Sequence, residues 1–323
     1  MLQDSFERRF SYLRLSLTES CNFRCNYCLP NGSACDNKAA ELTLTEIKHL
    51  VKGFALAGTS KIRLTGGEPS LRRDLCNIIE TVRGTPGITQ VAITTNGYRL
   101  NKDIDRWLDA GLTALNVSVD SLDADTFHLV TGQDRLPDIL AGIDRALALG
   151  LAKVKINTVL LRQYNGNSLS RFLDFVRDKP ISLRFIELMQ TGDNGQFFAA
   201  QHLSGRHIIN QLTAAGWQLL PRLYNAGPAL EYAHPDYLGT IGLIMPYSDH
   251  FCDDCNRLRV SSTGQLFLCL FAEQHQNLRH LLAQDQPDAL VDFLQAQLQF
   301  KPLSHQLANA QTGQTRQLAM IGG

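Results

Sequence analysis

Between residues 11 and 190, short apolar runs alternate with helical patterns six times, and this alternation constrains the fold more than any other feature. The apolar runs predict strands, and the segments between them carry apolar residues at helical spacing. Strands joined through helices by short connections form a parallel sheet with the helices packed outside it. The predicted strands are 12–17, 61–64, 90–94, 114–119, 154–160 and 183–186.

The segment 45–57 shows why the intervening stretches are predicted to be helical. Its apolar residues recur at i, i+3, i+4 and i+7 from Ile47 onward, and Gly58 offers a stop. Thr43 and Glu46 have the spacing of a capping box, which marks a helix start. The other predicted helices are 72–83, 101–110, 123–130, 136–149 and 168–178.

Several predicted strands are apolar on one face and polar on the other, because side chains alternate along a strand. Arg14, Arg63 and Lys155 lie on the polar face of three different strands. A closed eight-stranded barrel fills its interior with apolar layers, so a polar interior predicts an open barrel around a charged ligand. Cations without partners are costly inside a protein, and a triphosphate would neutralise them. An alternative pairs Arg63 and Lys155 internally with Glu68 or Asp120.

The βα rhythm ends near residue 190, which predicts two regions. Residues 1–190 are expected to form an α/β domain, an incomplete (β/α)6 TIM-like barrel. Residues 191–323 are expected to form an α+β extension that ends in Gly322 and Gly323. Its predicted parts are a helix at 204–215, hairpin-like segments to 245, strands at 257–262 and 266–270, and a helical region at 277–300.

Six of the eight cysteines fall into two sets of three. Loops this short make strained disulfides, so metal ligation is the better interpretation. Structural zinc usually takes four protein ligands, whereas three leave a position open for chemistry, and all-thiolate sites select zinc or iron–sulfur clusters. In the zinc alternative, His250 or His275 completes the second set. The sets are Cys21, Cys25 and Cys28, and Cys252, Cys255 and Cys269; Cys35 and Cys76 remain without a role.

The charge balance argues against binding driven by a global field. Lys+Arg and Asp+Glu are both 31, and 44% of residues are hydrophobic. Such a chain can bury a core, and it has no net charge to draw it onto nucleic acid or a membrane surface. The sequence contains no apolar run of membrane-spanning length and no signal-peptide pattern at its start, so a cytoplasmic protein is expected.

The first cysteine set, with Tyr27 before its last member, resembles the signature of the radical S-adenosylmethionine superfamily. The sequence Gly66-Gly67-Glu68-Pro69 resembles that superfamily's motif for the methionine amino group. Further residues make the resemblance more specific than the superfamily. They are Cys252-x2-Cys255-Asn256-Arg257-Leu258-Arg259, Cys269 and the Gly-Gly ending. Together, over residues 10–323, they resemble the GTP 3′,8-cyclase family of molybdenum cofactor biosynthesis.

The resemblance implies two [4Fe–4S] clusters, S-adenosylmethionine as a cofactor and GTP as the substrate. The first cluster would be held by Cys21, Cys25 and Cys28, and the second by Cys252, Cys255 and Cys269. Residues implied to bind S-adenosylmethionine are Tyr27, Gly67, Ser118 and Met189. Residues implied to bind GTP are Arg14, Arg63, Thr94, Lys155, Arg257, Leu258 and Arg259. Gly322 and Gly323 would take part in catalysis.

The implied reaction is that of a lyase. A 5′-deoxyadenosyl radical removes hydrogen from the ribose C3′ of GTP, and the carbon radical attacks C8 of guanine to give 3′,8-cyclo-7,8-dihydro-GTP. The implied partners are an external one-electron reductant, the downstream cyclic pyranopterin monophosphate synthase and a second copy of the chain. Two alternatives remain: another radical enzyme with an auxiliary cluster, such as a peptide-modifying one, and a zinc-stabilised binding protein without catalysis.

Overall fold

The computed structural model describes residues 1–33, 40–222, 226–315 and 317–322. Cys35 and Gly323, which the sequence analysis singled out, lie outside these ranges. Within them, no helix is long and apolar enough to cross a membrane.

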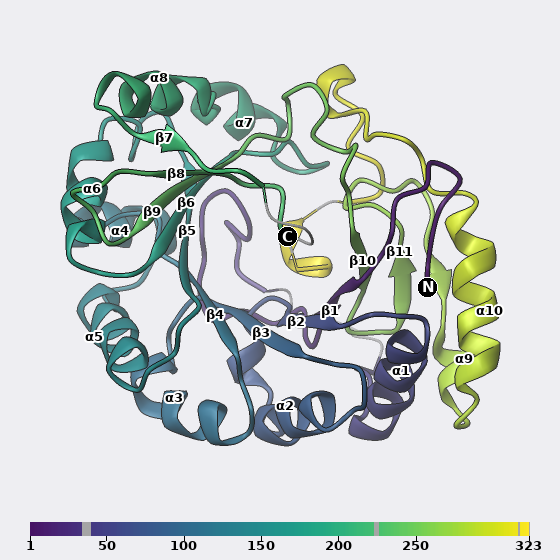
Figure 1. Cartoon of the computed structure of the whole chain (residues 1–323). Coiled ribbons are helices and arrows are strands. Elements are labelled where there is room, and N and C mark those ends of the chain that lie inside the picture. Colours follow the sequence, from purple (N-terminus) through teal and green to yellow (C-terminus); the bar gives the residue numbers. More distant parts are fainter. Residues whose placement is uncertain (34–39, 223–225, 316, 323) are drawn as a thin grey trace.

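In the described residues, the strands form one curved sheet in the order β12-β11-β10-β1-β2-β3-β4-β5-β6-β9-β8-β7 (Figure 1). The neighbours from β10 through β9 all pair in parallel. The strands are β1 (Tyr12–Ser16), β2 (Lys61–Thr65), β3 (Gln90–Thr95), β4 (Ala114–Ser118), β5 (Val154–Leu160), β6 (Ser182–Glu187), β7 (Gln218–Leu219), β8 (Leu230–Ala233), β9 (Thr240–Ile244), β10 (Arg257–Val260), β11 (Gln265–Phe267) and β12 (Gln276–Asn277).

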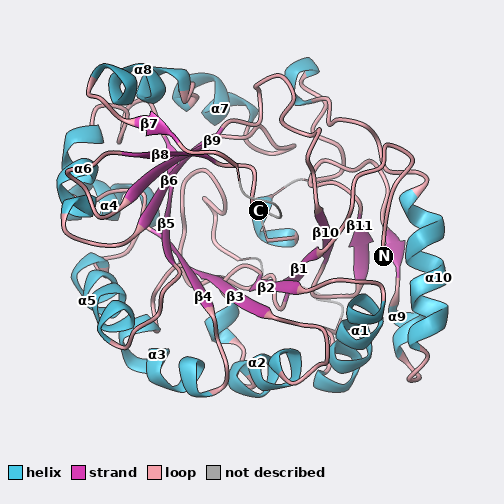
Figure 2. Cartoon of the chain, viewed as in Figure 1, coloured by secondary structure: helices cyan, strands magenta, loops and turns pink. Residues whose placement is uncertain are grey.

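Helices pack on the outer side of this sheet (Figure 2). The α-helices are α1 (Leu44–Leu56), α2 (Leu75–Arg83), α3 (Leu100–Asp109), α4 (Ala124–Thr131), α5 (Leu136–Ala148), α6 (Leu169–Arg177), α7 (Gly195–Gln201), α8 (Arg206–Ala214), α9 (Arg279–Leu282) and α10 (Pro287–Leu298). Short 3-10 helices are η1 (Pro69–Leu71), η2 (Leu307–Asn309) and η3 (Leu318–Met320).

The predicted alternation of strands and helices is confirmed through β6, with ends that shift by a few residues. The capping box of α1 forms as expected, because Thr43 Oγ1 accepts from the Glu46 amide at 3.2 Å and Glu46 Oε2 accepts from the Thr43 amide at 2.8 Å. The predicted start of the second helix is too early: Pro69 opens the separate turn η1, and α2 begins only at Leu75. Helix α7 has no counterpart in the sequence analysis.

The region after residue 190 continues the same sheet at both edges. β9 pairs in parallel with β6, and β10 pairs in parallel with β1. The incomplete TIM-like barrel is therefore widened by strands from the α+β extension. Strand pairing crosses the predicted division at residue 190, and that division stays a prediction.

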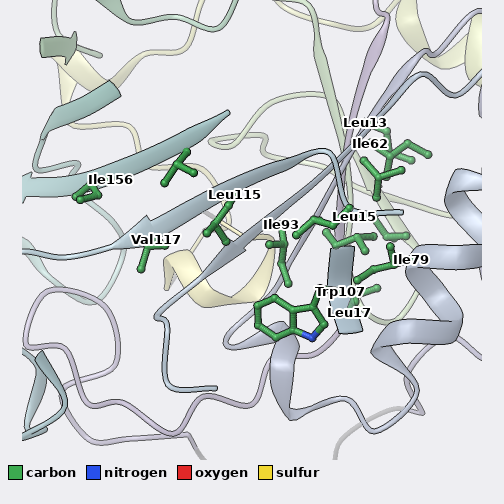
Figure 3. Close-up of a cluster of buried hydrophobic side chains, with 14 of the residues drawn as sticks. Leu13, Leu15, Leu17, Ile62, Ile79, Ile93, Trp107, Leu115, Val117 and Ile156 are labelled. Atoms are coloured by element: carbon green, nitrogen blue, oxygen red, sulfur yellow. The ribbon is translucent and has the colours of Figure 1, made fainter. Parts of the chain in front are cut away.

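The hydrophobic core lies between the sheet and its outer helices. Leu13, Leu15 and Ile62 are fully buried there with Ile79 of α2 and Trp107 of α3 (Figure 3). These strand residues alternate with the polar residues that the sequence analysis assigned to the interior. The apolar half of each strand thus fixes the direction in which its polar half points.

Candidate active site inside the barrel

A single cavity inside the barrel is lined by residues of both cysteine sets. The first set follows β1, so it lies at the carboxyl ends of the parallel strands. Cys252 and Cys255 precede β10, and Cys269 follows β11, which runs antiparallel to β10. Because β10 runs parallel to β1, the second set lies at the opposite end of the strands. A ligand in this cavity therefore sits between two groups of thiols.

The three cysteines of the first set are partly buried, and their thiols influence one another's pKa. Burial and the neighbouring Cys21 raise the pKa of Cys28 to about 12. Burial also raises the pKa of Cys25 well above its usual value, with further contributions from Asp120 and Cys28. Replacing the proton by iron removes this penalty, since a metal ligand is a thiolate. In the described ranges, no group of three His, Cys, Asp or Glu side chains is arranged to hold a single metal ion. A [4Fe–4S] cluster binds each thiolate through a different iron, so its ligands surround a volume.

Gly66 and Gly67 pack against the backbone of the cysteine loop. A Cβ on Gly67 would lie 2.6 Å from the carbonyl oxygen of Glu19 and would overlap that of Ser20. The Gly67 amide donates to the Thr18 carbonyl at 2.7 Å. The close approach that the glycines permit is thus to the cysteine loop itself, which they hold on the end of β2.

The carboxylate of Glu68 joins the loops that follow β2 and β3. It is fully buried and accepts from the Ser70 amide, the Thr95 hydroxyl and the Asn96 amide at 2.7–2.9 Å. The side chain of Asn96 in turn donates to Cys21 Sγ over 3.8 Å. Through these hydrogen bonds, Glu68 holds in place the loop whose Asn96 contacts the first cysteine set.

Asp120, which follows β4, is likewise hydrogen-bonded to neighbouring residues. It accepts from the Tyr27 hydroxyl and from the Val159 amide, both at 2.9 Å. Burial raises its pKa to about 6. In the described structure, neither of these two buried carboxylates forms an ion pair with Arg63 or Lys155. The alternative of internal pairing with them is therefore not supported.

Basic side chains form a grid across β2, β1 and β10. Parallel pairing aligns residues of the three strands into rows, and residues two apart on a strand share a face. Five of the six grid positions are basic, and all six line the cavity. The rows are Lys61, Tyr12 and Arg257, followed by Arg63, Arg14 and Arg259.

Crowding and burial weaken the positive charge of this region. Burial, with Arg257 nearby, lowers the pKa of Arg259 to about 10. Burial lowers the pKa of Lys61 to about 8, and burial together with Arg184 lowers that of Lys155 to about 7. A polyanion between these side chains would stabilise their charged forms. The predicted polar, cationic interior is confirmed by this arrangement.

Lys61, Arg184 and Glu231 extend the site beyond the residues named from the sequence. Arg184 of β6 lines the cavity and forms an ion pair with Glu231 of β8, which also accepts from the Ser182 hydroxyl at 2.9 Å. The alternation of Leu183, Arg184 and Phe185 carried the same signal as the other strands and was overlooked. Lys61 lies two residues before Arg63 and so shares its polar face, but the family resemblance does not place it among the ligand contacts. The sequence around Glu231 contains no pattern that would place this residue in the site.

The second cysteine set lies among basic residues. Burial raises the pKa of Cys255, but Lys301 and Arg257 outweigh it and bring the value down to about 6. Arg8 donates from Nη1 to the carbonyl of Cys252 at 3.0 Å. His305 lines the cavity beside this set. These surroundings favour the thiolates of Cys252 and Cys255, the form that binds iron or zinc, whereas burial raises the pKa of Cys269.

The histidines considered for a fourth zinc ligand are engaged elsewhere. His250 pairs with Asp253 at 2.8 Å, and the ring of His275 stacks on Phe267. Neither belongs to the cavity lining as described.

Most of the residues predicted for cofactor and substrate line this one cavity. Among the described residues, the exceptions are Leu258 and Gly322. Leu258 is 1% exposed and belongs to the core on the helix side, because it alternates with its two arginine neighbours. The residues that do line the cavity are Tyr27, Gly67, Ser118, Met189, Arg14, Arg63, Thr94, Lys155, Arg257 and Arg259.

The C-terminal end of the chain reaches into the middle of the barrel (Figure 1). The carbonyl oxygen of Gly322 accepts from Arg259 Nη1 at 2.9 Å. Gly322 has φ +63°, and a Cβ there would overlap the side chain of Thr65. The tail thus contacts a residue predicted to bind substrate, while the part of Gly322 and Gly323 in catalysis stays a prediction; Gly323 lies outside the described residues.

Several polar side-chain atoms at the cavity are buried but unsatisfied within the described structure. Within the described structure, Arg63 Nε, Asn116 Oδ1 and Asn157 Oδ1 are buried without a hydrogen-bond partner. All three residues line the cavity. Because buried polar atoms are almost always satisfied, they indicate a polar molecule that completes the site.

Comparisons with known proteins agree with this site. Residues 15–176 match the family model "Radical SAM superfamily", which implies a [4Fe–4S] cluster and S-adenosylmethionine, and residues 181–307 match "Molybdenum Cofactor Synthesis C". Streptococcus suis SuiB, solved with S-adenosylmethionine, has a similar fold, with a TM-score of 0.63 and 14% identity over 90% of this chain and 68% of that one.

Curated relatives named GTP 3′,8-cyclase are similar over the whole length. The proteins of Vibrio atlanticus and Yersinia pestis are each 53% identical, covering 99% and 100% of this chain and 97% and 99% of the relatives. That of Stenotrophomonas maltophilia is 54% identical over 100% of this chain and 99% of its own. The chain therefore belongs to the GTP 3′,8-cyclase family of radical S-adenosylmethionine enzymes.

Proposed function

We propose that this protein converts GTP to (8S)-3′,8-cyclo-7,8-dihydro-GTP, the first step of molybdenum cofactor biosynthesis. The observation that carries the proposal is the basic grid of β2, β1 and β10, which lies between two separate cysteine sets. A cofactor-generated radical needs a substrate held at a fixed distance and orientation. The two ends of the cavity provide one place for the radical source and another for the substrate.

Cys21, Cys25 and Cys28 hold the first [4Fe–4S] cluster, and Tyr27, Gly67, Ser118 and Met189 surround S-adenosylmethionine. The cofactor bound there supplies hydrogen abstraction from the ribose C3′ by its 5′-deoxyadenosyl radical, using one electron from an external reductant. The chain's part is to orient the cofactor. The hydrogen bond from Tyr27 to Asp120 fixes the tyrosine ring, and the packing of Gly67 fixes the loop.

Cys252, Cys255 and Cys269 would hold a second [4Fe–4S] cluster, which would supply an anchor for the guanine of GTP. The support is the low pKa of Cys255 and the place of all three cysteines in the cavity lining, at the end of the strands opposite the first set. Arg257 belongs to both the cluster's surroundings and the grid, so it links base and phosphate recognition. Leu258 contributes only its backbone, because its side chain faces the core.

The phosphates of GTP lie on the grid. Guanidinium groups form paired hydrogen bonds with phosphate oxygens, which suits Arg14, Arg63 and Arg259. Thr94 accepts from Arg63 Nη1 at 3.0 Å and so directs that side chain. Lys155 approaches from the other side of the barrel. Gly322 holds Arg259, and we assign Gly323 to the same tail.

The remaining assignments rest on the family alone. They are an external reductant, a downstream cyclic pyranopterin monophosphate synthase, a homodimer and a cytoplasmic location.

The decisive experiment is metal analysis of anaerobically reconstituted protein, followed by incubation with S-adenosylmethionine, reductant and GTP. We expect about eight irons per chain, since each [4Fe–4S] cluster holds four, and 5′-deoxyadenosine together with the cyclised nucleotide. About four irons with one zinc would remove the second cluster from the proposal. Protein without iron would overturn it entirely.

GTP affinity should fall as pH rises from 7 to 9. The free site has Lys155 with a pKa of about 7 and Lys61 with a pKa of about 8, and a bound triphosphate raises both. Binding therefore takes up protons above pH 7, and its full strength is present only below these free-state pKa values. Each coupled proton weakens binding by up to about tenfold per pH unit. Titration calorimetry across this range measures the slope.

The matched variant for this prediction is Lys155→Arg, whose guanidinium stays charged at every pH in the range. It should reduce the slope by up to about one proton relative to the parent. A GTP affinity that does not change between pH 7 and 9 would contradict the assignment of these lysines.

A further inference from the structure

Tyr12 occupies the centre of the first row of the grid, between Lys61 and Arg257. We propose that Tyr12 is a positioning residue for the phosphates of GTP, whose ring face holds Lys61 and Arg63 in place to receive them. The inference rests on the proposed function, because it assigns a role within the same GTP site.

The geometry places two cations against one ring. The ammonium of Lys61 lies 4.5 Å from the centroid of the Tyr12 ring, and the guanidinium carbon of Arg63 lies 5.8 Å from it. Both fall within the roughly 6 Å over which a cation is attracted to an aromatic face. Tyr12 is itself only 6% exposed and is fixed in β1, so the ring is a rigid platform.

The two cations need such a platform. Among the described residues, neither Lys61 nor Arg63 forms an ion pair with a carboxylate. Lys61 and Arg63 lie two residues apart on the same face of β2, so their like charges repel, and long basic side chains lose several rotamers when they are held in one place. The negative face of the Tyr12 ring, close to both side chains, offsets part of this repulsion. An aliphatic side chain at position 12 would fill the space but offer no such attraction.

The electrostatic surroundings of the Tyr12 hydroxyl agree with this placement. Burial raises its pKa, but Arg63, Arg14 and Lys61 outweigh burial and bring the pKa down to about 7. The ring thus lies within the positive field of the grid. The attraction described here requires the ring rather than the hydroxyl, which provides the control for the test.

The test uses protein with both cysteine sets loaded, without reductant, so that GTP binds but does not react. Calorimetry compares GTP with guanosine for Tyr12→Leu, Tyr12→Phe and the parent. We expect Tyr12→Leu to weaken GTP binding by roughly tenfold or more, the effect of losing two partly buried cation–π contacts. Guanosine affinity should stay as in the parent, and Tyr12→Phe should bind GTP nearly as well as the parent.

The matched control is Tyr237→Leu. Tyr237 also carries a cation on its ring, with Arg177 at 5.2 Å, but it lies outside the cavity. It should leave GTP affinity unchanged. Equal loss of GTP and guanosine binding in Tyr12→Leu would indicate general damage to the site and overturn the inference, as would unchanged GTP binding.

A second series of variants tests the inference even where Tyr12→Leu misfolds. Phenylalanines with increasing ring fluorination at position 12 keep the shape but weaken the negative face of the ring. GTP affinity should fall stepwise along the series, and a flat series would overturn the inference. Parent protein that binds neither GTP nor guanosine would instead count against the proposed function, so the two failures are distinguishable.

Discussion

Replacing Cys252, Cys255 and Cys269 together with alanine should abolish formation of the cyclised nucleotide while leaving the first cysteine set functional. Iron should drop from about eight to about four per chain, since one [4Fe–4S] cluster remains. Reductive cleavage of S-adenosylmethionine should persist, because the first set and its bracing residues Glu68 and Asn96 lie at the other end of the strands. Without its second anchor the substrate is no longer fixed, and we expect a loss in product of roughly 10³-fold or more. Product and 5′-deoxyadenosine are measured by chromatography in the same reaction.

Cys76→Ala is the matched control for this triple variant. Cys76 lies on α2, outside both sets, and packs partly against the helix-side core. It should retain the full iron content and product formation. Cyclised product from the triple variant would remove the second set from substrate binding, and loss of iron from Cys76→Ala would show that both cysteine sets were misassigned.

The barrel half of this fold could be predicted from sequence because its signals are local. Alternation within each strand and helical periodicity between strands are complete within a dozen residues, as in 45–57 and its capping box. The same alternation placed Arg14, Arg63 and Lys155 in the interior, and all three line the cavity. Short-range patterns of this kind fix which face of an element is buried without knowledge of its neighbours.

Features that depend on distant pairing could not be predicted in this way. The pairing of β10 with β1 joins residues more than 240 positions apart, and nothing within Arg257–Val260 indicates its partner. That pairing creates the row in which Tyr12 lies between two cations. The contact between Glu231 and Arg184 likewise depends on β8 reaching the sheet through β9. The sequence could name the four arginines of the grid but not Lys61 or Tyr12, and not the order of the residues across the strands.

Gly322→Ala should displace the C-terminal tail and reduce turnover of GTP by roughly 10²-fold, because a substrate-binding arginine is then misplaced. Two causes add up at this position. A residue other than glycine at φ +63° costs about 1–2 kcal/mol, and the new Cβ would lie 2.7 Å from Thr65 Oγ1 and overlap Thr65 Cγ2. Thr65 is 2% exposed at the end of β2 and cannot move aside, so the tail must leave and Arg259 loses its acceptor. The measurement is kcat/KM for GTP, with iron content as evidence that both cysteine sets remain loaded.

The steric and conformational causes separate in a double-mutant cycle. In a Thr65→Ala background the overlaps with Cγ2 and Oγ1 are removed and only the contact with Cβ at 2.9 Å remains, so Gly322→Ala should cost less, about tenfold relative to Thr65→Ala alone. Gly150→Ala is the control for the backbone strain, because Gly150 has φ +81° with no atom within 4 Å of the new Cβ; it should cost stability but not kcat/KM. A loss of the same size in both backgrounds would show that Thr65 does not hold the tail. Parent-level turnover in Gly322→Ala would show that catalysis does not depend on the tail's contact with Arg259, and that the arginine is held for GTP by the grid alone.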